Sequence, residues 1–347
     1  VMDQHPDWVV LGAETASTVS SRGVYHLPIE KYQKHPSRQI TSYDVVAPPW
    51  AYAPDVEFEA LDRLPKVVGE FVWTGFDYLG EPTPYYMWNE PDDPNDWPAR
   101  SSYFGIVDLA GFPKDRYYLY QSRWASEPMV HVLPHWNWKG REGEAIPVMV
   151  YTNADEVELF LNGESLGRKT RGAAPVTLPV GENVNEEGRI ESPHRLVWET
   201  PWQAGALRAV AYRGGRDVAT KEVVTAGKPA QLRLVPDRTE LAADGRDLSF
   251  VTVRIEDEDG NLCPFADDLV RFTVEGAGRR EAVDNGNPAT LEPFQADERK
   301  AFAGLALLIV RSAGGEPGPI RVTARSEGLE SAETFLTTVA PPTRREH

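Results

Sequence analysis

Two short and almost continuously apolar runs constrain the fold more than any other feature of the sequence. They are Trp8–Gly12 and Val67–Trp73, and strands buried on both faces of a parallel sheet have this composition. Between them, Pro54–Leu64 spaces its apolar residues as a helix does, and Pro113–Trp124 begins with proline and continues with aromatic residues at helical spacing. The order strand, helix, strand, helix predicts the end of an α/β barrel.

The rest of the chain has a different pattern. Short alternating runs such as Ile146–Tyr151 and Glu156–Leu161, the latter followed by an Asn162-Gly163 turn, predict an antiparallel β-sandwich. After a linker near 225–229, further strand-like runs are separated by Asp-Gly, Gly-Gly and Asn-Gly-Asn-Pro signals, which predict a second sandwich of immunoglobulin type. These runs are Gln231–Val235, Leu248–Glu256, Leu269–Val274, Ala303–Val310 and Ile320–Ala324.

The predicted fold class is therefore multidomain, α/β plus all-β. Residues 1–126 are expected to be the C-terminal part of a (β/α)8 TIM barrel. Residues 127–226 and 227–343 are expected to form two immunoglobulin-like β-sandwiches. A chain of 347 residues is long enough for two or three such domains.

Composition narrows the classes of partner. With 36 basic and 53 acidic side chains the formal charge is −17, which disfavours nucleic acid and anionic membranes and suits a neutral substrate. Cys263 is the only cysteine, so neither an intrachain disulfide nor a cysteine-based zinc site can form. No apolar run is long enough to span a membrane. The start at Val1 has no signal-peptide pattern, and we expect the chain to have been cut from a longer protein.

Glu14 is the first candidate for chemistry, because it follows the first apolar run, where barrel enzymes place catalytic side chains. The alternative is that Glu14 only ends a strand in solvent or caps the next segment. The second candidate region, 69–78, again places an aromatic residue and a carboxylate, Trp73 and Asp77, beyond an apolar run.

These motifs, in this order, resemble glycoside hydrolase family 2, specifically its bacterial β-galactosidase-like members, over the whole chain. The segment 12–17 (GAETAS) with 20–25 (SSRGVY) resembles the seventh barrel strand and its loop. The segment 69–85 resembles the eighth strand, and 100–108 with the helix ending at Trp124 resembles the end of the barrel. Residues 127–224 resemble the sandwich domain that follows the barrel, and 228–340 resemble the bacterial Ig-like domain after it.

The resemblance implies a retaining glycosidase, in which one carboxylate attacks the anomeric carbon while a second protonates the leaving oxygen. Glu14 matches the nucleophile, and Trp73 matches a tryptophan of the sugar pocket, although a buried structural role is the alternative. Asp77 is expected either to bind sugar hydroxyls or to pair with Arg22 or Arg100. The acid/base glutamate belongs to an earlier strand, and Asn89-Glu90, in a Pro- and Asp-rich loop, is an unconvincing substitute.

The expected substrate is a terminal β-linked neutral sugar, with galactose the best match and mannose, glucose or arabinose-like sugars left open. Members that cleave glucuronides carry an Asn-x-Lys pair before the Gly-Ile of the last barrel segment, whereas this chain has Ser102-Tyr103-Phe104. Burying an unpaired sugar carboxylate would be costly. The chain alone is expected to be inactive. A homo-oligomer is left open, and the resemblance favours a periplasmic or extracellular location.

The alternative from another class is a non-catalytic binding or cell-surface spacer protein built on Ig-like domains. Separately, four sandwich tryptophans are candidates for a carbohydrate-binding platform, although such residues more often fill a core or a domain interface. They are Trp136, Trp138, Trp198 and Trp202. The acidic turn 256–260 (EDEDG) is better explained as a solvated turn than as a calcium site. The histidines lack metal-binding spacing, and we expect neither a metal nor a cofactor.

Overall fold

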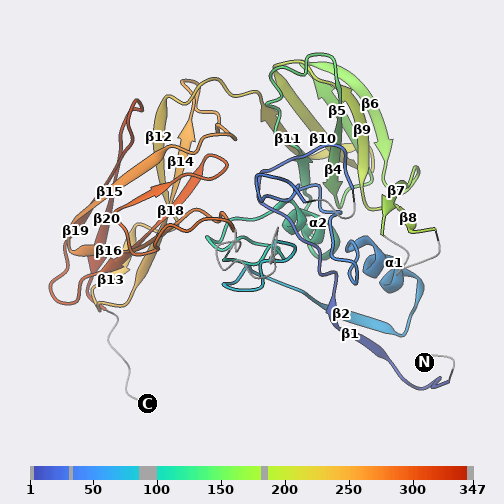
Figure 1. Ribbon diagram of the computed structural model, residues 1–347, viewed down its shortest axis with the longest axis horizontal. Helices are drawn as coiled ribbons and strands as arrows, with labels where there is room; N and C mark the ends of the chain where they lie inside the picture. Colours follow the sequence, from blue (N-terminus) through green and yellow to red (C-terminus); the bar gives the residue numbers. More distant parts are fainter. Residues whose placement is uncertain (1–3, 31–33, 86–99, 181–186, 342–347) are drawn as a thin grey trace. The chain divides into compact units, whose positions relative to one another are not determined.

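The computed structural model describes residues 4–30, 34–85, 100–180 and 187–341. The chain divides into two compact units, Val1–Thr225 with Asn287–Thr290 and Ala226–Gly286 with Leu291–His347 (Figure 1). No helix in the described part of the chain has the length and apolarity needed to cross a membrane. The predicted domain boundaries at 126 and 226 remain predictions.

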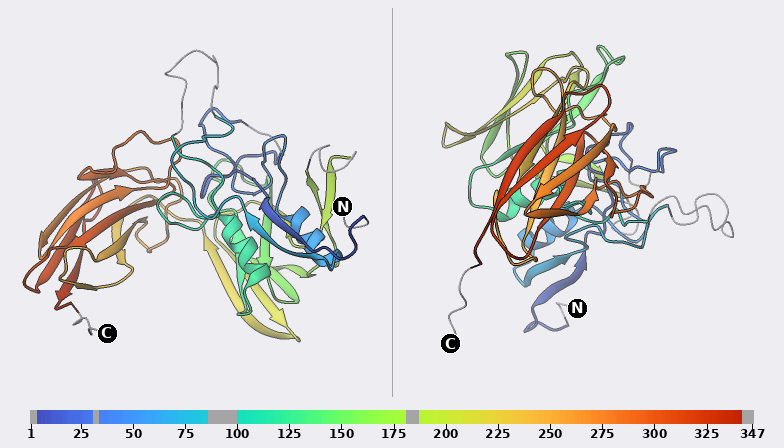
Figure 2. Two further views of the ribbon diagram at one scale, coloured as in Figure 1. Left: turned by 90° about the horizontal axis from the view of Figure 1, so that it is seen from below. Right: turned by 90° about the vertical axis from the view of Figure 1, so that its left-hand side faces the viewer.

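The first unit begins with a parallel strand pair. Strands β1 (Val10–Thr15) and β2 (Val67–Val72) are joined through helix α1 (Asp55–Arg63), and helix α2 (Asp115–Trp124) follows. Both helices were predicted to within two residues at each end. In Figures 1 and 2 the β1–β2 pair lies at the edge of this unit, beside α1. This pair forms a separate two-stranded parallel sheet, and the described residues do not form a closed barrel.

The expectation that both strands are buried on both faces is wrong for this chain. Val9, Leu11 and Phe71 are 67%, 52% and 63% exposed. The physical reason is that no further described strand pairs with β1 or β2, so that one face of the pair is uncovered. The opposite face is covered, since Val72 packs against a cluster that includes Phe58 of α1 and Leu119 of α2.

Most strands after α2 in the first unit form a sandwich, as predicted. One sheet has the strand order β3-β4-β9 and the other β11-β10-β5-β6. The bounds are β3 (Val130–Leu133), β4 (Ala145–Thr152), β5 (Glu156–Leu161), β6 (Glu164–Thr170), β9 (Leu196–Pro201), β10 (Ala206–Arg213) and β11 (Arg216–Val224), with a small hairpin of β7 (Val176–Pro179) and β8 (Arg189–Ser192). The predicted turn joins β5 to β6, with Asn162 and Gly163 at φ of 53° and 87°, the left-handed conformation that a tight hairpin needs.

The β3-β4-β9 sheet is buried on both faces. Ile146, Val148 and Val150 of β4 face the second sheet, while Met149 and Tyr151 pack with the residues that α1 and α2 bury. All four sandwich tryptophans named above belong to the core between the sheets and are at most 8% exposed. Their structural interpretation is confirmed, and they do not form an exposed aromatic platform.

The second unit is also a sandwich. Its sheets have the orders β12-β14-β18-β16 and β13-β20-β19-β15-β17 around one apolar core. The bounds are β12 (Gln231–Pro236), β13 (Glu240–Ala242), β14 (Leu248–Glu256), β15 (Leu269–Gly276), β16 (Gly278–Asp284), β17 (Glu298–Lys300), β18 (Leu305–Ser312), β19 (Pro319–Arg325) and β20 (Ala332–Val339). All five predicted strands are present.

The acidic turn after β14 is organised by Asp257. Its carboxylate accepts hydrogen bonds from the backbone N–H groups of Gly227, Asp259 and Asn261 at 2.7, 3.0 and 2.8 Å. The structure therefore confirms a turn, but with Asp257 only 4% exposed rather than solvated. No described group of three His, Cys, Asp or Glu side chains is arranged to hold a metal ion.

Three partly or fully buried histidines predict that the first unit loses stability in mild acid. Burial lowers the pKa of His26, His135 and His194 from 6.5 to about 4, and all three belong to this unit. Below pH 6.5 the unfolded chain binds a proton at each of these histidines, whereas the folded unit does not until the pH approaches 4. The stability that the neutral histidines give is therefore complete above pH 6.5 and declines as the pH falls toward 4. For His135 the loss between pH 7 and pH 5 is roughly 1 to 2 kcal/mol.

Tryptophan fluorescence can follow this loss, because all ten tryptophans lie before residue 226. The denaturant concentration at which the 347-residue chain is half unfolded should be lower at pH 5 than at pH 7. The variant His135→Asn should show a smaller difference between the two pH values. A midpoint that does not change over this interval would contradict the burial of these imidazoles.

Candidate active site

The carboxyl ends of β1 and β2 place two of the predicted site residues side by side. The strands are parallel, with Gly12 opposite Glu70 and Thr15 opposite Val72. The pairing continues one step further, since the Trp73 N–H donates to the Thr15 carbonyl at 2.9 Å. Glu14 and Trp73 therefore lie at the same end of the sheet, as the sequence predicted.

Glu14 is part of β1 instead of following it. The strand is longer than the apolar run because backbone pairing with β2 continues to Thr15. The Glu14 side chain is exposed, whereas the next residues, from Thr15 to Arg22, are all buried. An exposed carboxylate at the carboxyl end of a parallel strand is accessible to a ligand from the uncovered face.

Trp73 is half-buried. It packs against an apolar cluster and its ring meets that of Tyr78 edge to face, with 5.9 Å between centroids. The cluster consists of Val19, Ile40, Val46, Tyr85, Tyr103 and Phe104. The indole is thus supported by the protein on one side and partly exposed on the other, an arrangement that suits a wall of a pocket. Its role in substrate binding stays a prediction.

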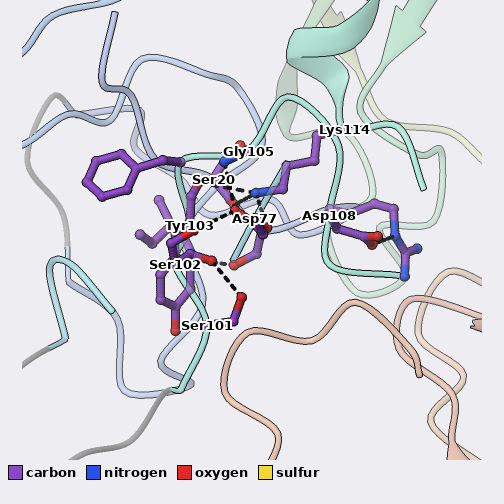
Figure 3. A network of polar contacts seen from close by, with 12 residues as sticks. Ser20, Asp77, Ser101, Ser102, Tyr103, Gly105, Asp108 and Lys114 are labelled. Carbon is purple, nitrogen blue, oxygen red and sulfur yellow. Dashed lines mark hydrogen bonds and ion pairs between the residues drawn. The ribbon is translucent and has the colours of Figure 1, made fainter. Parts of the chain in front are cut away.

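Asp77 is buried, at 4% exposure, and its carboxylate is bound by the protein (Figure 3). Lys114 Nζ lies 2.6 Å from Oδ2, and Oδ1 accepts hydrogen bonds from the Gly105 N–H at 2.7 Å and the Ser102 hydroxyl at 3.3 Å. Burial raises the pKa of Asp77 and lowers the pKa of Lys114, and each partner offsets the change in the other. These contacts favour the structural alternative, with Lys114 as the ion-pair partner in place of the expected Arg22 or Arg100.

Lys114 and Arg116, at the start of α2, were missed by the sequence reasoning. Lys114 Nζ also donates to the carbonyls of Ser20 and Tyr103 at 2.8 and 3.1 Å. Arg116 donates to the carbonyl of Phe104 at 3.1 Å. The two cations thereby join the loop after β1 to the segment after β2. The signal that could have revealed them is the charged sequence Lys114-Asp115-Arg116 at the start of an aromatic helix.

Two further ion pairs complete this framework. Arg22 lies 2.6 Å from Asp108, and Arg116 lies 2.7 Å from Asp44, with side chains that are 8% exposed or less. Buried charges are costly unless paired, so these contacts specify how the loops pack against each other.

The segment in which glucuronide-cleaving relatives carry a lysine is buried here. Ser102, Tyr103 and Phe104 are at most 1% exposed, and the Tyr103 hydroxyl donates to the Arg38 carbonyl at 2.8 Å. The three side chains supply no cation. Asn89-Glu90, the weak acid/base candidate, lies outside the described residues.

Two family models match the chain. Residues 232–334 match glycoside hydrolase family 2 C-terminal domain 5, and residues 143–219 match a domain of unknown function, DUF4982. These matches cover most of the second unit and of the first sandwich.

Among full proteins, the chain is 43% identical to the β-galactosidase BoGH2A of Bacteroides ovatus, over 94% of the chain and 36% of that protein. It is 33% identical to a putative β-glucuronidase of Formosa agariphila, over 74% of the chain and 22% of that protein. Among solved structures, a β-glycosidase from Bacteroides vulgatus is similar with a TM-score of 0.80 at 30% identity, over 96% of the chain and 42% of that structure.

The chain thus spans 22% to 42% of the length of these three relatives. The family models and the relatives agree with each other. The chain therefore belongs to glycoside hydrolase family 2 and carries C-terminal domains of that family.

Proposed function

We propose that the protein containing this chain is a retaining exo-β-glycosidase, with Glu14 as its nucleophile and β-galactosides as its substrate class. The observation that carries the proposal is the exposed carboxylate of Glu14 at the carboxyl end of a parallel strand, next to the half-buried Trp73. Its membership in a glycoside hydrolase family and the similarity to a protein named β-galactosidase support the reaction class.

The uncovered face of the β1–β2 pair supports a larger barrel around this site. Parallel strands are normally covered on both faces, yet Leu11 and Phe71 are more than half exposed on the face away from the helices. We propose that further parallel strands of a (β/α)8 barrel cover them. Glu14 and Trp73 would then lie at the carboxyl-terminal mouth, where barrel enzymes bind substrates.

The chemistry follows from one carboxylate on each side of the glycosidic bond. The Glu14 carboxylate attacks the anomeric carbon, the bond to the leaving oxygen breaks, and a second carboxyl group about 5 to 5.5 Å away donates a proton to that oxygen. Water activated by the same second group then hydrolyses the glycosyl ester. We assign this second group to another strand of the proposed barrel.

The preference for a neutral sugar rests on the segment 102–104. Moving a glucuronide carboxylate out of water into a site without a cation costs several kcal/mol of binding free energy. Ser102, Tyr103 and Phe104 are buried and uncharged, and Lys114 is already bound to Asp77. The greater identity to a β-galactosidase than to a putative β-glucuronidase points the same way. The sandwich tryptophans are buried and therefore give the non-catalytic alternative no exposed aromatic platform.

The test compares aryl glycosides with the full-length protein. We expect kcat/KM for a 4-nitrophenyl β-galactoside to exceed that for the β-glucuronide by at least about 100-fold, equivalent to about 2.7 kcal/mol in transition-state binding. Proton NMR of the first turnovers should show the β-anomer of the released sugar. A preference for the glucuronide would refute the substrate class, and initial release of the α-anomer would refute the retaining mechanism.

A further inference from the structure

Strand β1 contains a bulge at Ala13 and Glu14. Gly12 pairs with Glu70 and Thr15 with Val72, so that β1 advances by three residues where β2 advances by two. One residue of β1 is therefore extra. Bulges of this kind turn side chains to a new direction and are frequent next to active sites.

The bulge changes which side of the sheet each residue faces. Residues three apart in an unbroken strand face opposite sides. Here Thr15 Cγ2 lies only 2.6 Å from the place that a Cβ on Gly12 would take, so both residues direct their substituents to the same side. This is the helix-facing side, to which Val72, the partner of Thr15, also belongs.

The bulge determines the side of the sheet to which the Glu14 side chain points. Ala13 and Glu14 are both exposed, as is Leu11 on the uncovered face. With Gly12 fixed and no bulge, strict alternation would turn Glu14 toward the helices, away from the uncovered face. The bulge thus keeps the carboxylate on the side where a substrate can reach it.

A side-chain hydrogen bond spans the bulge. The Thr15 hydroxyl donates to Glu70 Oε2 at 2.7 Å. Thr15 follows the bulge and Glu70 pairs with Gly12, which precedes it, so this bond connects the two sides of the bulge. A weaker contact runs from the same hydroxyl to the Phe71 carbonyl at 3.3 Å. Thr15 is 5% exposed, so water does not readily replace this bond.

The partly buried carboxylate of Glu70 is energetically unfavourable at this position. Its Oε1 is buried without a hydrogen-bond partner among the described residues. Burial raises the pKa of the Glu70 carboxyl, the bond from Thr15 opposes that rise, and the charge of Glu57 adds to it. Buried polar groups that are only half satisfied are uncommon and call for an explanation beyond stability.

We infer that Thr15 and Glu70 are positioning residues, whose hydrogen bond fixes the bulge and so directs the carboxylate of Glu14 toward the anomeric carbon. The inference rests on the proposed function, because the orientation of Glu14 affects catalysis only if Glu14 is the nucleophile. Neither residue is assigned to touch the substrate.

The experiment uses Thr15→Val, which removes the hydroxyl but keeps the shape, and Thr15→Ser, which keeps the hydroxyl. In the full-length protein, Thr15→Val should lower the rate of the glycosylation step, measured as the burst of nitrophenol release, by about 10 to 100-fold, with KM changed less than about threefold. Thr15→Ser should stay within about threefold of the unmodified protein. The matched control is Thr177→Val, since Thr177 donates to Glu191 at 2.6 Å in the β7–β8 hairpin, and it should leave the rate unchanged.

A second pair of variants keeps the test decisive if Thr15→Val does not fold. Glu70→Gln retains an acceptor and should remain active, whereas Glu70→Leu should lose the glycosylation rate as Thr15→Val does. The double variant Thr15→Val/Glu70→Leu should be no slower than the slower single variant, because both remove one hydrogen bond.

Unchanged glycosylation rates in both Thr15→Val and Glu70→Leu would overturn the inference, as would equal losses in Thr177→Val. These outcomes differ from failure of the proposed function. That failure would appear as an unmodified protein without glycosidase activity, or as a Glu14→Gln variant with full activity.

Discussion

Glu14→Gln in the full-length protein should lower kcat for an aryl β-galactoside by about 10⁴-fold or more, which corresponds to about 5.4 kcal/mol of lost transition-state stabilisation. Glutamine has the same size and still accepts hydrogen bonds, but its neutral amide cannot form the glycosyl ester that the retaining mechanism requires. Because Glu14 is exposed, its replacement should leave the unfolding midpoint nearly unchanged.

The control for this variant is Glu164→Gln, another exposed glutamate, in strand β6 of the sandwich. It should retain full activity. Initial rates with saturating substrate, together with the midpoint of each purified variant, separate a chemical defect from a folding defect. More than about a tenth of the original kcat in Glu14→Gln would remove Glu14 from the role of nucleophile.

Arg195→Met should destabilise the first unit by about 3 to 5 kcal/mol, the cost of leaving a buried charge without its partner. Arg195 is 1% exposed, and its guanidinium lies 2.6 Å from Asp55 at the start of α1. It also donates to the carbonyls of Tyr43 and Asp44 at 2.8 and 3.1 Å. Burial alone would raise the pKa of Asp55, but Arg195 and the hydrogen bonds to the carboxylate lower it.

Arg168→Met is the matched control, because Arg168 pairs with Glu158 at 3.0 Å on an exposed part of the sandwich. Exposed pairs contribute about 1 kcal/mol or less, so this variant should differ little from the unmodified chain. Denaturant unfolding followed by tryptophan fluorescence measures the first unit selectively. Equal losses in the two variants would show that burial of the Arg195–Asp55 pair has no special energetic weight. The variant Arg195→Met/Asp55→Leu, which removes both charges, should recover part of the lost stability.

Local patterns in the sequence were enough to predict both helices and several of the strands. The helical spacing of Pro54–Leu64 and Pro113–Trp124 led to α1 and α2, and the Asn162-Gly163 dipeptide led to the hairpin between β5 and β6. Each of these signals lies within a few residues of the structure that it specifies. The order of the motifs likewise placed Glu14 and Trp73 at neighbouring strand ends.

Contacts between distant residues could not be predicted in this way. Arg195 and Asp55 are 140 residues apart, and no periodicity relates them. Asp77 was expected to bind either sugar hydroxyls or an arginine, whereas the structure pairs it with Lys114. The bulge at Glu14 depends on the register between β1 and β2, which a single strand does not encode. The geometry that directs the nucleophile therefore became visible only in three dimensions.

Trapping of the glycosyl-enzyme tests the central claim most directly. A 2,4-dinitrophenyl 2-deoxy-2-fluoro-β-galactoside has a good leaving group, and its fluorine slows hydrolysis of the ester, so the covalent intermediate should accumulate. Mass spectrometry of the digested full-length protein should then find one 2-deoxy-2-fluorogalactosyl group on the peptide containing Glu14, with fragmentation placing it on that residue. A label on Glu70 or on any other carboxylate, or full inactivation without a label on Glu14, would contradict the account.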